Sequence, residues 1–215
     1  MSIAGSPGPH GAWTPGGHIP EPSVPEDSPS IGIKLNHFCV RIRDPNPTLH
    51  FYVNLMGMRT IFTMNVGPWT IYYLGFPNTS AHRADPKAFS LETAAKLSHT
   101  LGLLELYHIH GTKSDPNFPG YSTGNTPPNL GLCHFGFTVP DVESTVERLR
   151  KEGVEVVKEL GVCTRRSIPI SEWEEQRGYA GGEDIANRYK AIFEQIAFVK
   201  DPVSRPDMIV RLEMS

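Results

Sequence analysis

A short pattern that occurs twice constrains the fold of this chain more than any other feature. His37-Phe38-x-Val40-x-Ile42-x-Asp44 is matched by His134-Phe135-x-Phe137-x-Val139-x-Asp141. Apolar residues at alternate positions predict a strand in each copy, and the segment after each copy has the apolar spacing of a helix. Two similar halves, each opening on a histidine, predict a ligand site between the halves.

The residues before the first copy have a different composition from the rest. Residues 1–31 are rich in Pro, Gly and Ser and have almost no periodic apolar pattern. Such a segment cannot bury enough surface to offset the entropy lost on ordering. We therefore expect a disordered tail over 1–31 and one domain over 32–215, made of two modules at about 33–115 and 130–215.

The same order of elements is predicted in both modules, so the chain is expected to have an α+β fold of two βαβββ units. In the first, Asn46 and Pro47 look like the N-cap and first residue of a helix that ends near Gly57. In the second, Asp141 caps the helix, and an insertion at 162–193 separates two strands. Strands are expected at about 35–43, 61–65, 70–75, 103–110, 132–139, 154–158, 195–200 and 208–214.

Charge, apolar runs and cysteines exclude several classes of protein. A net charge of -3 argues against binding to nucleic acid or to anionic membranes. No segment approaches the ~18 consecutive apolar residues of a membrane span, and the N-terminus has no secretory pattern. Cys39, Cys133 and Cys163 are odd in number and form no Cys-x-x-Cys motif. This cysteine pattern suits a reducing compartment, so we expect a cytoplasmic protein. The expected partner of the site between the halves is a small molecule.

Alternation along the strand at 103–110 places one carboxylate among apolar side chains. Glu105 shares its face with Tyr107 and Ile109, whereas His108 and His110 point to the other face. An ionised carboxylate among apolar neighbours is costly unless it is paired or bound to a metal. We therefore take Glu105, and neither of these two histidines, as a candidate ligand.

Four residues form a candidate metal centre of the type His/Glu/His/Glu. His37 and His134 open the two repeated strands, Glu105 lies on a mixed face, and Glu213 is the only acidic residue of the last strand. Such a centre favours an enzyme over a binding module.

Five motifs carry a resemblance to a known family, and they cover roughly residues 33–161 and 195–215. They are Leu35-Asn36-His37-Phe38 through Asp44-Pro45, Phe51-Tyr52 through Gly57-Met58, Leu104-Glu105-Leu106, Gly131-Leu132-Cys133-His134-Phe135 through Asp141-Val142, and Phe198-Val199-Lys200-Asp201-Pro202. These motifs resemble those of glyoxalase I (lactoylglutathione lyase), in the vicinal-oxygen-chelate superfamily. The resemblance implies paired βαβββ modules in an open eight-stranded sheet, the glyoxalase/bleomycin-resistance/dioxygenase fold.

By motif position, the resemblance implies that His37, Glu105, His134 and Glu213 hold a divalent metal at a homodimer interface. Each site would take His37 and Glu105 from one chain and His134 and Glu213 from the other. Zinc and nickel are both expected candidates and cobalt is possible, since imidazole and carboxylate ligands do not separate these metals.

The implied reaction converts the methylglyoxal-glutathione hemithioacetal to S-lactoylglutathione. A glutamate moves the proton, and the metal stabilises an ene-diolate. Glu213 is the expected base, with Glu105 serving the opposite face. Arg41 lies where the family has an arginine that pairs with a glutathione carboxylate, and Tyr107 is expected beside the substrate.

The chain departs from the family in its glutathione contacts. Ile109 stands where an asparagine is common, and Leu130 stands where a basic residue is common. Arg165 and Arg166 of the 162–193 insertion could replace the lost contacts or could belong to a solvated face.

The register of the last strand is a second departure. Direct spacing from the Asp-Pro motif puts Met208 at the ligand position, and a few inserted residues restore Glu213. If Glu213 is a ligand, four protein ligands disfavour an extradiol dioxygenase, which needs open positions for oxygen and substrate. If Glu213 is not a ligand, this objection no longer holds.

Two alternatives to the glyoxalase I reaction stay open. One is another reaction of the superfamily, such as an isomerase or epimerase acting on a small metabolite without glutathione. The other is a non-catalytic member of the fold that sequesters a small molecule.

Overall fold

The computed structural model describes residues 23–168, 170–178, 185, 187–201 and 208–215. Residues 1–22 of the predicted tail, and part of the predicted insertion, therefore lie outside the described residues. Residues 23–36 form turns and extended chain with no helix or strand.

The first module is a βαβββ unit with one four-stranded sheet. Its strands are β1 (His37–Ile42), β2 (Arg59–Asn65), β3 (Trp69–Gly75) and β4 (Leu103–Ile109). Their order in the sheet is β1-β4-β3-β2, and β1 pairs with β4 in parallel. Between β1 and β2 lies α1 (Pro45–Leu49), which continues as a π-helical turn, η1 (His50–Leu55). Helices α2 (Ser80–Ala84) and α3 (Pro86–Ala95) and the 3₁₀ turn η2 (Leu97–His99) lie between β3 and β4 in the sequence.

The second module repeats this topology. Its strands are β7 (His134–Val139), β8 (Val156–Lys158), β9 (Ala197–Asp201) and β10 (Met208–Met214), in the order β7-β10-β9-β8. Strand β7 pairs with β10 in parallel, as β1 does with β4. Helix α4 (Val142–Lys151) follows β7, and η3 (Arg165–Ser167), α5 (Glu172–Glu175) and α6 (Asn187–Phe193) belong to the insertion. A small hairpin of β5 (Asn125–Thr126) and β6 (Asn129–Leu130) precedes β7.

The helix after each repeated strand begins and ends in the same way. Asp44 caps α1 by accepting a hydrogen bond from the backbone of Asn46, and Asp141 caps α4 by accepting one from Ser144. The prediction that Asn46 caps the first helix is wrong, because the capping carboxylate comes earlier and Pro45 fills the first turn. After both helices a glycine takes a positive φ, 85° at Gly57 and 80° at Gly153.

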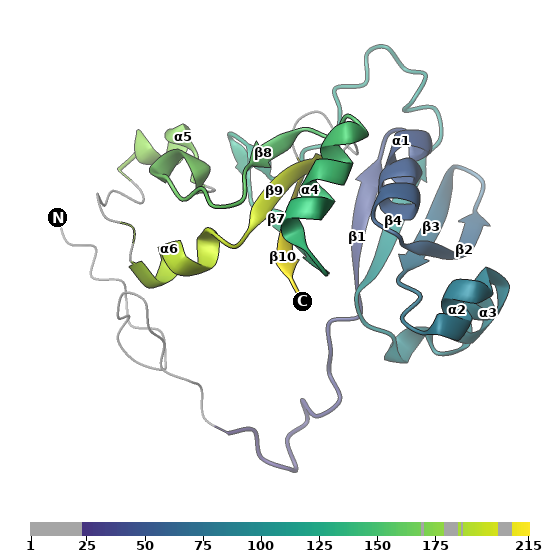
Figure 1. Cartoon of the computed structure of the whole chain (residues 1–215). Helices are drawn as coiled ribbons and strands as arrows, with labels where there is room; N and C mark the ends of the chain where they lie inside the picture. Colours follow the sequence, from purple (N-terminus) through teal and green to yellow (C-terminus); the bar gives the residue numbers. More distant parts are fainter. Residues whose placement is uncertain (1–22, 169, 179–184, 186, 202–207) are drawn as a thin grey trace.

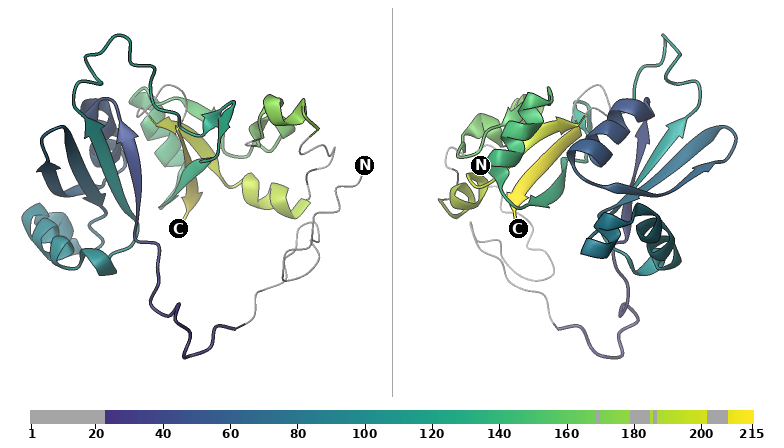
Figure 2. Two further views of the ribbon diagram at one scale, coloured as in Figure 1. Left: turned by 180° about the vertical axis from the view of Figure 1, so that it is seen from behind. Right: turned by 45° about the vertical axis from the view of Figure 1, so that its right-hand side comes forward.

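The two modules lie side by side, with α1 and α4 next to each other (Figures 1 and 2). One buried core runs through both, from Ile42, Phe51 and Tyr52 of the first module to Leu149 and Val210 of the second. The Arg148 guanidinium of α4 also donates a 2.7 Å hydrogen bond to the carbonyl of Leu55.

The predicted α+β class and the paired βαβββ modules are confirmed. Within one chain, the eight strands of the modules divide into two four-stranded sheets. Strands β1 and β7, which carry the two repeated histidines, are edge strands of these sheets.

Candidate metal centre

His37 and Glu105 come together because β1 and β4 run in parallel. Cys39 pairs with Glu105 across the sheet, so His37, Cys39 and Glu105 lie on one face. The Nε2 atom of His37 lies 3.3 Å from an oxygen of Glu105, and only 14% of the Glu105 side chain is exposed. An imidazole nitrogen and a carboxylate oxygen at this separation can share one divalent ion.

Asn36 fixes the orientation of the His37 ring. Its Oδ1 atom lies 2.9 Å from Nδ1 of His37, and its Nδ2 donates to the carbonyls of Leu97 and Thr100. Because the Asn36 nitrogen is committed to those carbonyls, the oxygen faces the ring and accepts a hydrogen bond from the Nδ1–H group. The lone pair is then on Nε2, beside Glu105, as in histidines that bind a metal. No signal in the sequence marks Asn36 as part of the site, although it directly precedes the repeated histidine.

The surroundings of Glu105 are electrostatically suited to a cation. Partial burial, the negative charge of Glu105 and a hydrogen bond with Glu105 raise the pKa of the Cys39 thiol to about 11. Partial burial and the same charge raise the pKa of Tyr73 to about 12. The Tyr73 ring packs 5.5 Å from that of His37. A bound divalent ion would offset the charge that disfavours both anions.

His134 supplies the equivalent group of the second module. Burial lowers its pKa, the charge of Arg211 lowers it further, and the charge of Glu213 partly opposes this. The imidazole is therefore held neutral, which metal ligation requires. Its Nδ1 atom is buried and has no hydrogen-bond partner among the described residues. Since an unpaired buried nitrogen is costly, this orphaned atom fits a site whose ring binds a metal or a further acceptor.

Glu213 lies on the His134 face of the second sheet, but it is bound to Arg211. Its carboxylate accepts a 2.5 Å hydrogen bond from the Arg211 guanidinium. In the sheet Glu213 pairs with Thr138, and Ile209 pairs with His134. The structure thus brings Glu213 to the same face as His134 without a direct contact between the two among the described residues.

A cavity of about 170 Å³ opens beside His134 and is lined in part by residues of the insertion. Its lining includes Lys158, Arg166 and Ser167, and no carboxylate among the described residues. Lys158 is 3% exposed, and its ammonium donates to the carbonyls of Phe193, Ile196 and Glu159. Because the Lys158 ammonium is committed to these three carbonyls, Arg166 is the cationic side chain of this lining that could meet an anionic group.

The two arginines of the insertion have different surroundings. The guanidinium of Arg165 lies 2.6 Å from a carboxylate oxygen of Glu175. Arg166 lines the cavity beside His134 and forms no ion pair with the described residues. Arg166 is therefore the better placed of the two to meet a ligand.

Both predicted substrate contacts, Arg41 and Tyr107, lie on the His37 face of the first sheet. Arg41 pairs with Tyr107 on the His37 face, is exposed, and has no hydrogen-bond or ion-pair partner among the described residues. Tyr107 stacks on Trp69 with ring centroids 6.3 Å apart. His110 is bound to Thr70 at 2.8 Å on the opposite face, as expected for a residue outside the centre.

Within one chain, the described residues do not complete the predicted centre. No three His, Cys, Asp or Glu side chains in this part of the chain lie together as a group able to hold a metal ion. The structure therefore presents two half-sites: His37 in contact with Glu105, and His134 on the same sheet face as Glu213.

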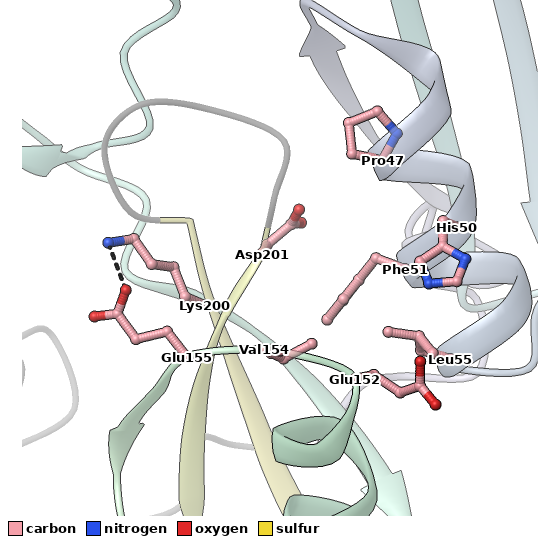
Figure 3. A pocket seen from close by; sticks show the side chains of 10 residues that line it. Pro47, His50, Phe51, Leu55, Glu152, Val154, Glu155, Lys200 and Asp201 are labelled. Carbon is pink, nitrogen blue, oxygen red and sulfur yellow. Dashed lines mark hydrogen bonds and ion pairs between the residues drawn. The ribbon is translucent and has the colours of Figure 1, made fainter.

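A separate cavity of about 340 Å³ lies between the modules (Figure 3). Phe51 and Leu55 of η1 face Val154 and Asp201 of the second module across it. The hydroxyl of Tyr52 donates a hydrogen bond to buried Asp201. None of the predicted ligands lines this cavity, so we assign it to the contact between modules.

Membrane insertion through a helix has no support among the described residues, where every helix is too short or too polar to cross a bilayer.

Comparison with known proteins gives a consistent match. Residues 34–167 match the sequence model of the Glyoxalase/Bleomycin resistance protein/Dioxygenase superfamily. Glyoxalase I of Saccharomyces cerevisiae is 31% identical over 142 residues, covering 64% of this chain and 40% of that protein. Lactoylglutathione lyase of Schizosaccharomyces pombe is 32% identical over 177 residues, covering 79% and 55%. Lactoylglutathione lyase of Pseudomonas aeruginosa is 32% identical over 131 residues, covering 59% and 69%.

The chain spans about half the length of the two yeast relatives that it matches. Among solved structures, glyoxalase I from Zea mays superimposes with a TM-score of 0.50 at 19% identity, covering 85% of this chain and 44% of that chain. At this identity the superposition supports the fold alone.

Proposed function

This chain belongs to the glyoxalase/bleomycin resistance protein/dioxygenase superfamily, and we propose that it is a metal-dependent glyoxalase I-type lyase. It would convert the methylglyoxal-glutathione hemithioacetal to S-lactoylglutathione. The observation that carries the proposal is the His37–Glu105 pair at 3.3 Å, with the His37 ring oriented by Asn36. Relatives named glyoxalase I or lactoylglutathione lyase support the choice of reaction.

The complete centre is proposed to form across a homodimer. His37 and Glu105 of one chain would face His134 and Glu213 of the partner subunit. The two half-sites within a single chain do not join among the described residues, and both histidines lie on edge strands. A two-fold dimer would complete two equivalent centres, since each subunit supplies one half of each.

A bound divalent ion would act as a Lewis acid on the substrate oxygens, and zinc, nickel and cobalt all suit the proposed ligands. The protein's own task is then to move one proton. We propose that the carboxylate of Glu213 takes the proton from the carbon next to the carbonyl and returns it to the neighbouring carbon. One C–H bond breaks and another forms, and the hydroxyl proton passes to the former ketone oxygen, with no net oxidation. Glu105 is the carboxylate on the opposite side of the centre.

Arg41 and Arg166 are the proposed contacts for the glutathione carboxylates. Both guanidinium groups lack an ion-pair partner among the described residues, and Arg166 lines the cavity beside His134. A guanidinium binds a carboxylate through two parallel hydrogen bonds. Together they would compensate for Ile109 and Leu130, with Tyr107 beside the substrate on the Arg41 face.

We further propose a cytoplasmic location, which is supported by the three cysteines all being free. The predicted boundaries, a tail over 1–31 and a domain over 32–215, stay proposals as well.

The test is formation of lactoylglutathione from methylglyoxal and glutathione by apo protein reconstituted separately with Zn, Ni and Co. We expect turnover with at least one metal, near-complete loss of it in His37→Ala, and little change in His50→Ala, a matched exposed histidine outside the centre. If the metal binds tightly but no thioester forms, the glyoxalase I assignment is wrong. Another superfamily reaction, on a metabolite without glutathione, would then be the better assignment.

A further inference from the structure

The two modules differ at one position that their shared topology makes directly comparable. In the first module, His37 pairs with Leu103, and Glu105 lies two residues further along β4. In the second, His134 pairs with Ile209, so the residue two further along β10 is Arg211. Arg211 therefore occupies in the second module the place that Glu105 occupies in the first.

Glu213 lies too far from His134 along the strand direction to contact it as Glu105 contacts His37. Glu105 pairs with the residue two after His37, whereas Glu213 pairs with Thr138, four after His134. At roughly 3.3 Å per residue, the backbone of Glu105 lies about 7 Å further along the strand direction than that of His37, and the backbone of Glu213 about 13 Å further than that of His134. This doubling agrees with the contacts, because Glu105 lies against His37 while Glu213 lies against Arg211.

Along β10, Arg211 lies between Ile209, the strand partner of His134, and Glu213. Its guanidinium donates a hydrogen bond from Nη2 to the Glu213 carboxylate. Its Nε atom is buried without a hydrogen-bond partner among the described residues. A buried charged donor with no acceptor is costly, so the complete site should offer it an oxygen, such as one of the substrate.

Resting on the proposed metal centre, we infer that Arg211 takes the position of the fourth ligand and positions Glu213 outside the coordination sphere. The protein ligands are then His37, Glu105 and His134, and Glu213 is a base that does not bind the metal. With three protein ligands, a bound ion would have positions left for substrate oxygens. Arg211 is a positioning residue that fixes the carboxylate of Glu213 and faces the substrate.

The experiment measures Co²⁺ binding by the full-length apo protein, using calorimetry for affinity and the visible absorption spectrum for coordination. We expect Glu105→Gln to weaken binding by at least about tenfold and to change the spectrum, because a ligand is lost. Glu213→Gln should leave affinity within about twofold and the spectrum unchanged, while lowering turnover strongly.

Arg211→Glu tests the inference by adding a ligand. It puts a carboxylate in the second module at the position equivalent to Glu105 of the first. We expect it to tighten Co²⁺ binding by about tenfold or more and to shift the spectrum. Arg211→Gln removes the positive charge without adding a ligand, and it should give a smaller gain with no spectral shift. Combining Arg211→Glu with Glu213→Gln removes repulsion between the two carboxylates and should keep the gain.

Two results would overturn the inference in different ways. If Glu213→Gln weakens Co²⁺ binding as much as Glu105→Gln does, and Arg211→Glu gives no gain, then Glu213 is a ligand and only this inference fails. If the wild-type protein binds no Co²⁺, Zn²⁺ or Ni²⁺, the metal centre itself fails, and the proposed function fails with it.

Discussion

The rings of Phe38 and Phe135 pack against each other with centroids 5.5 Å apart and planes tilted by 54°. Each phenylalanine directly follows the histidine of its repeat. Because side chains alternate across a strand, His37 and His134 point away from this contact. Among the described residues no metal-binding group joins the two histidines, which is why we propose that a second copy completes the centre.

Mixing two inactive variants tests this arrangement. We expect His37→Ala and His134→Ala to be inactive as separate homodimers, because each lacks a ligand in both centres. In a refolded equimolar mixture, about half of the dimers are mixed, and each has one intact centre and one doubly altered centre. Activity and bound metal should return to about a quarter of the wild-type level.

The same mixture can contradict the shared centre. Recovery should be absent when His37→Ala is mixed with Glu105→Gln, since both changes lie in the same half-site. If this control pair recovers as well as the first pair, or if the first pair does not recover at all, the ligands do not come from two chains.

Removing the Asn36 side chain should weaken metal binding without touching a ligand. Asn36→Ala takes away the oxygen that holds Nδ1 of His37 at 2.9 Å. Loss of such an orienting partner typically costs 10–100-fold in metal affinity. We expect a change of about that size in the dissociation constant for Zn²⁺, measured by competition with a chromophoric chelator.

A second variant separates orientation of His37 from folding of the loop. Asn36→Asp keeps an acceptor for His37 but replaces the nitrogen that donates to the carbonyls of Leu97 and Thr100. We expect it to lower the melting temperature more than Asn36→Ala does, while keeping more of the metal affinity. If affinity and melting temperature fall in parallel in both variants, Asn36 acts through folding alone.

The fold could be predicted because its signals are local. The repeated alternation in β1 and β7, the capping residue Asp141 and the glycines after both helices each depend on residues close in sequence. The missed cap at Asp44 shows the limit of such signals, since both Asp44-Pro45 and Asn46-Pro47 fit the start of a helix.

The site was only partly predictable, because its remaining contacts join residues that are distant in sequence. The face of Glu105 follows from alternation alone, but Asn36 is oriented by carbonyls more than sixty residues away. The position of Glu213 depends on how β10 pairs with β7, and the preceding segment gives no motif that fixes this register. Direct spacing pointed to Met208, whereas the strand pairing puts Arg211 beside Gly136.

The hydrogen bond between Tyr52 and Asp201 joins the two modules, and its loss should reduce their stability. Both residues are 1% exposed, and burial and the negative charge of Asp201 raise the pKa of the Tyr52 hydroxyl well above its usual value. A hydrogen bond to a charged acceptor contributes about 1.5–3 kcal/mol. We expect Tyr52→Phe to lower the free energy of unfolding by that amount, measured by urea denaturation at neutral pH.

Tyr72→Phe is the matched control for this change. Tyr72 lies in the core of the first module, half-buried, and its hydroxyl has no hydrogen-bond partner among the described residues. Loss of the Tyr72 hydroxyl should change the free energy of unfolding by less than about 0.5 kcal/mol. Equal effects of the two substitutions would mean that the contact between Tyr52 and Asp201 contributes little.

The cap of α4 predicts a defined dependence of stability on pH. Hydrogen bonds from the side chain and backbone of Ser144 lower the pKa of Asp141 below its usual value. The folded protein therefore binds this proton less tightly than the unfolded chain does. The resulting stabilisation is fully present above the unfolded pKa, about 4, and is lost as the pH falls through the lower folded value.

Asp141→Asn isolates the charge, because asparagine also caps a helix but does not ionise. At pH 6 we expect wild-type protein to be more stable to urea than Asp141→Asn, since the carboxylate also interacts favourably with the helix N-terminus. The difference should shrink as the pH is lowered from about 5 to about 3. Asp141→Ala, which cannot cap, should be less stable than Asp141→Asn throughout that range. A difference between wild type and Asp141→Asn that stays constant from pH 6 to pH 3 would show that the ionised carboxylate of Asp141 does not stabilise α4.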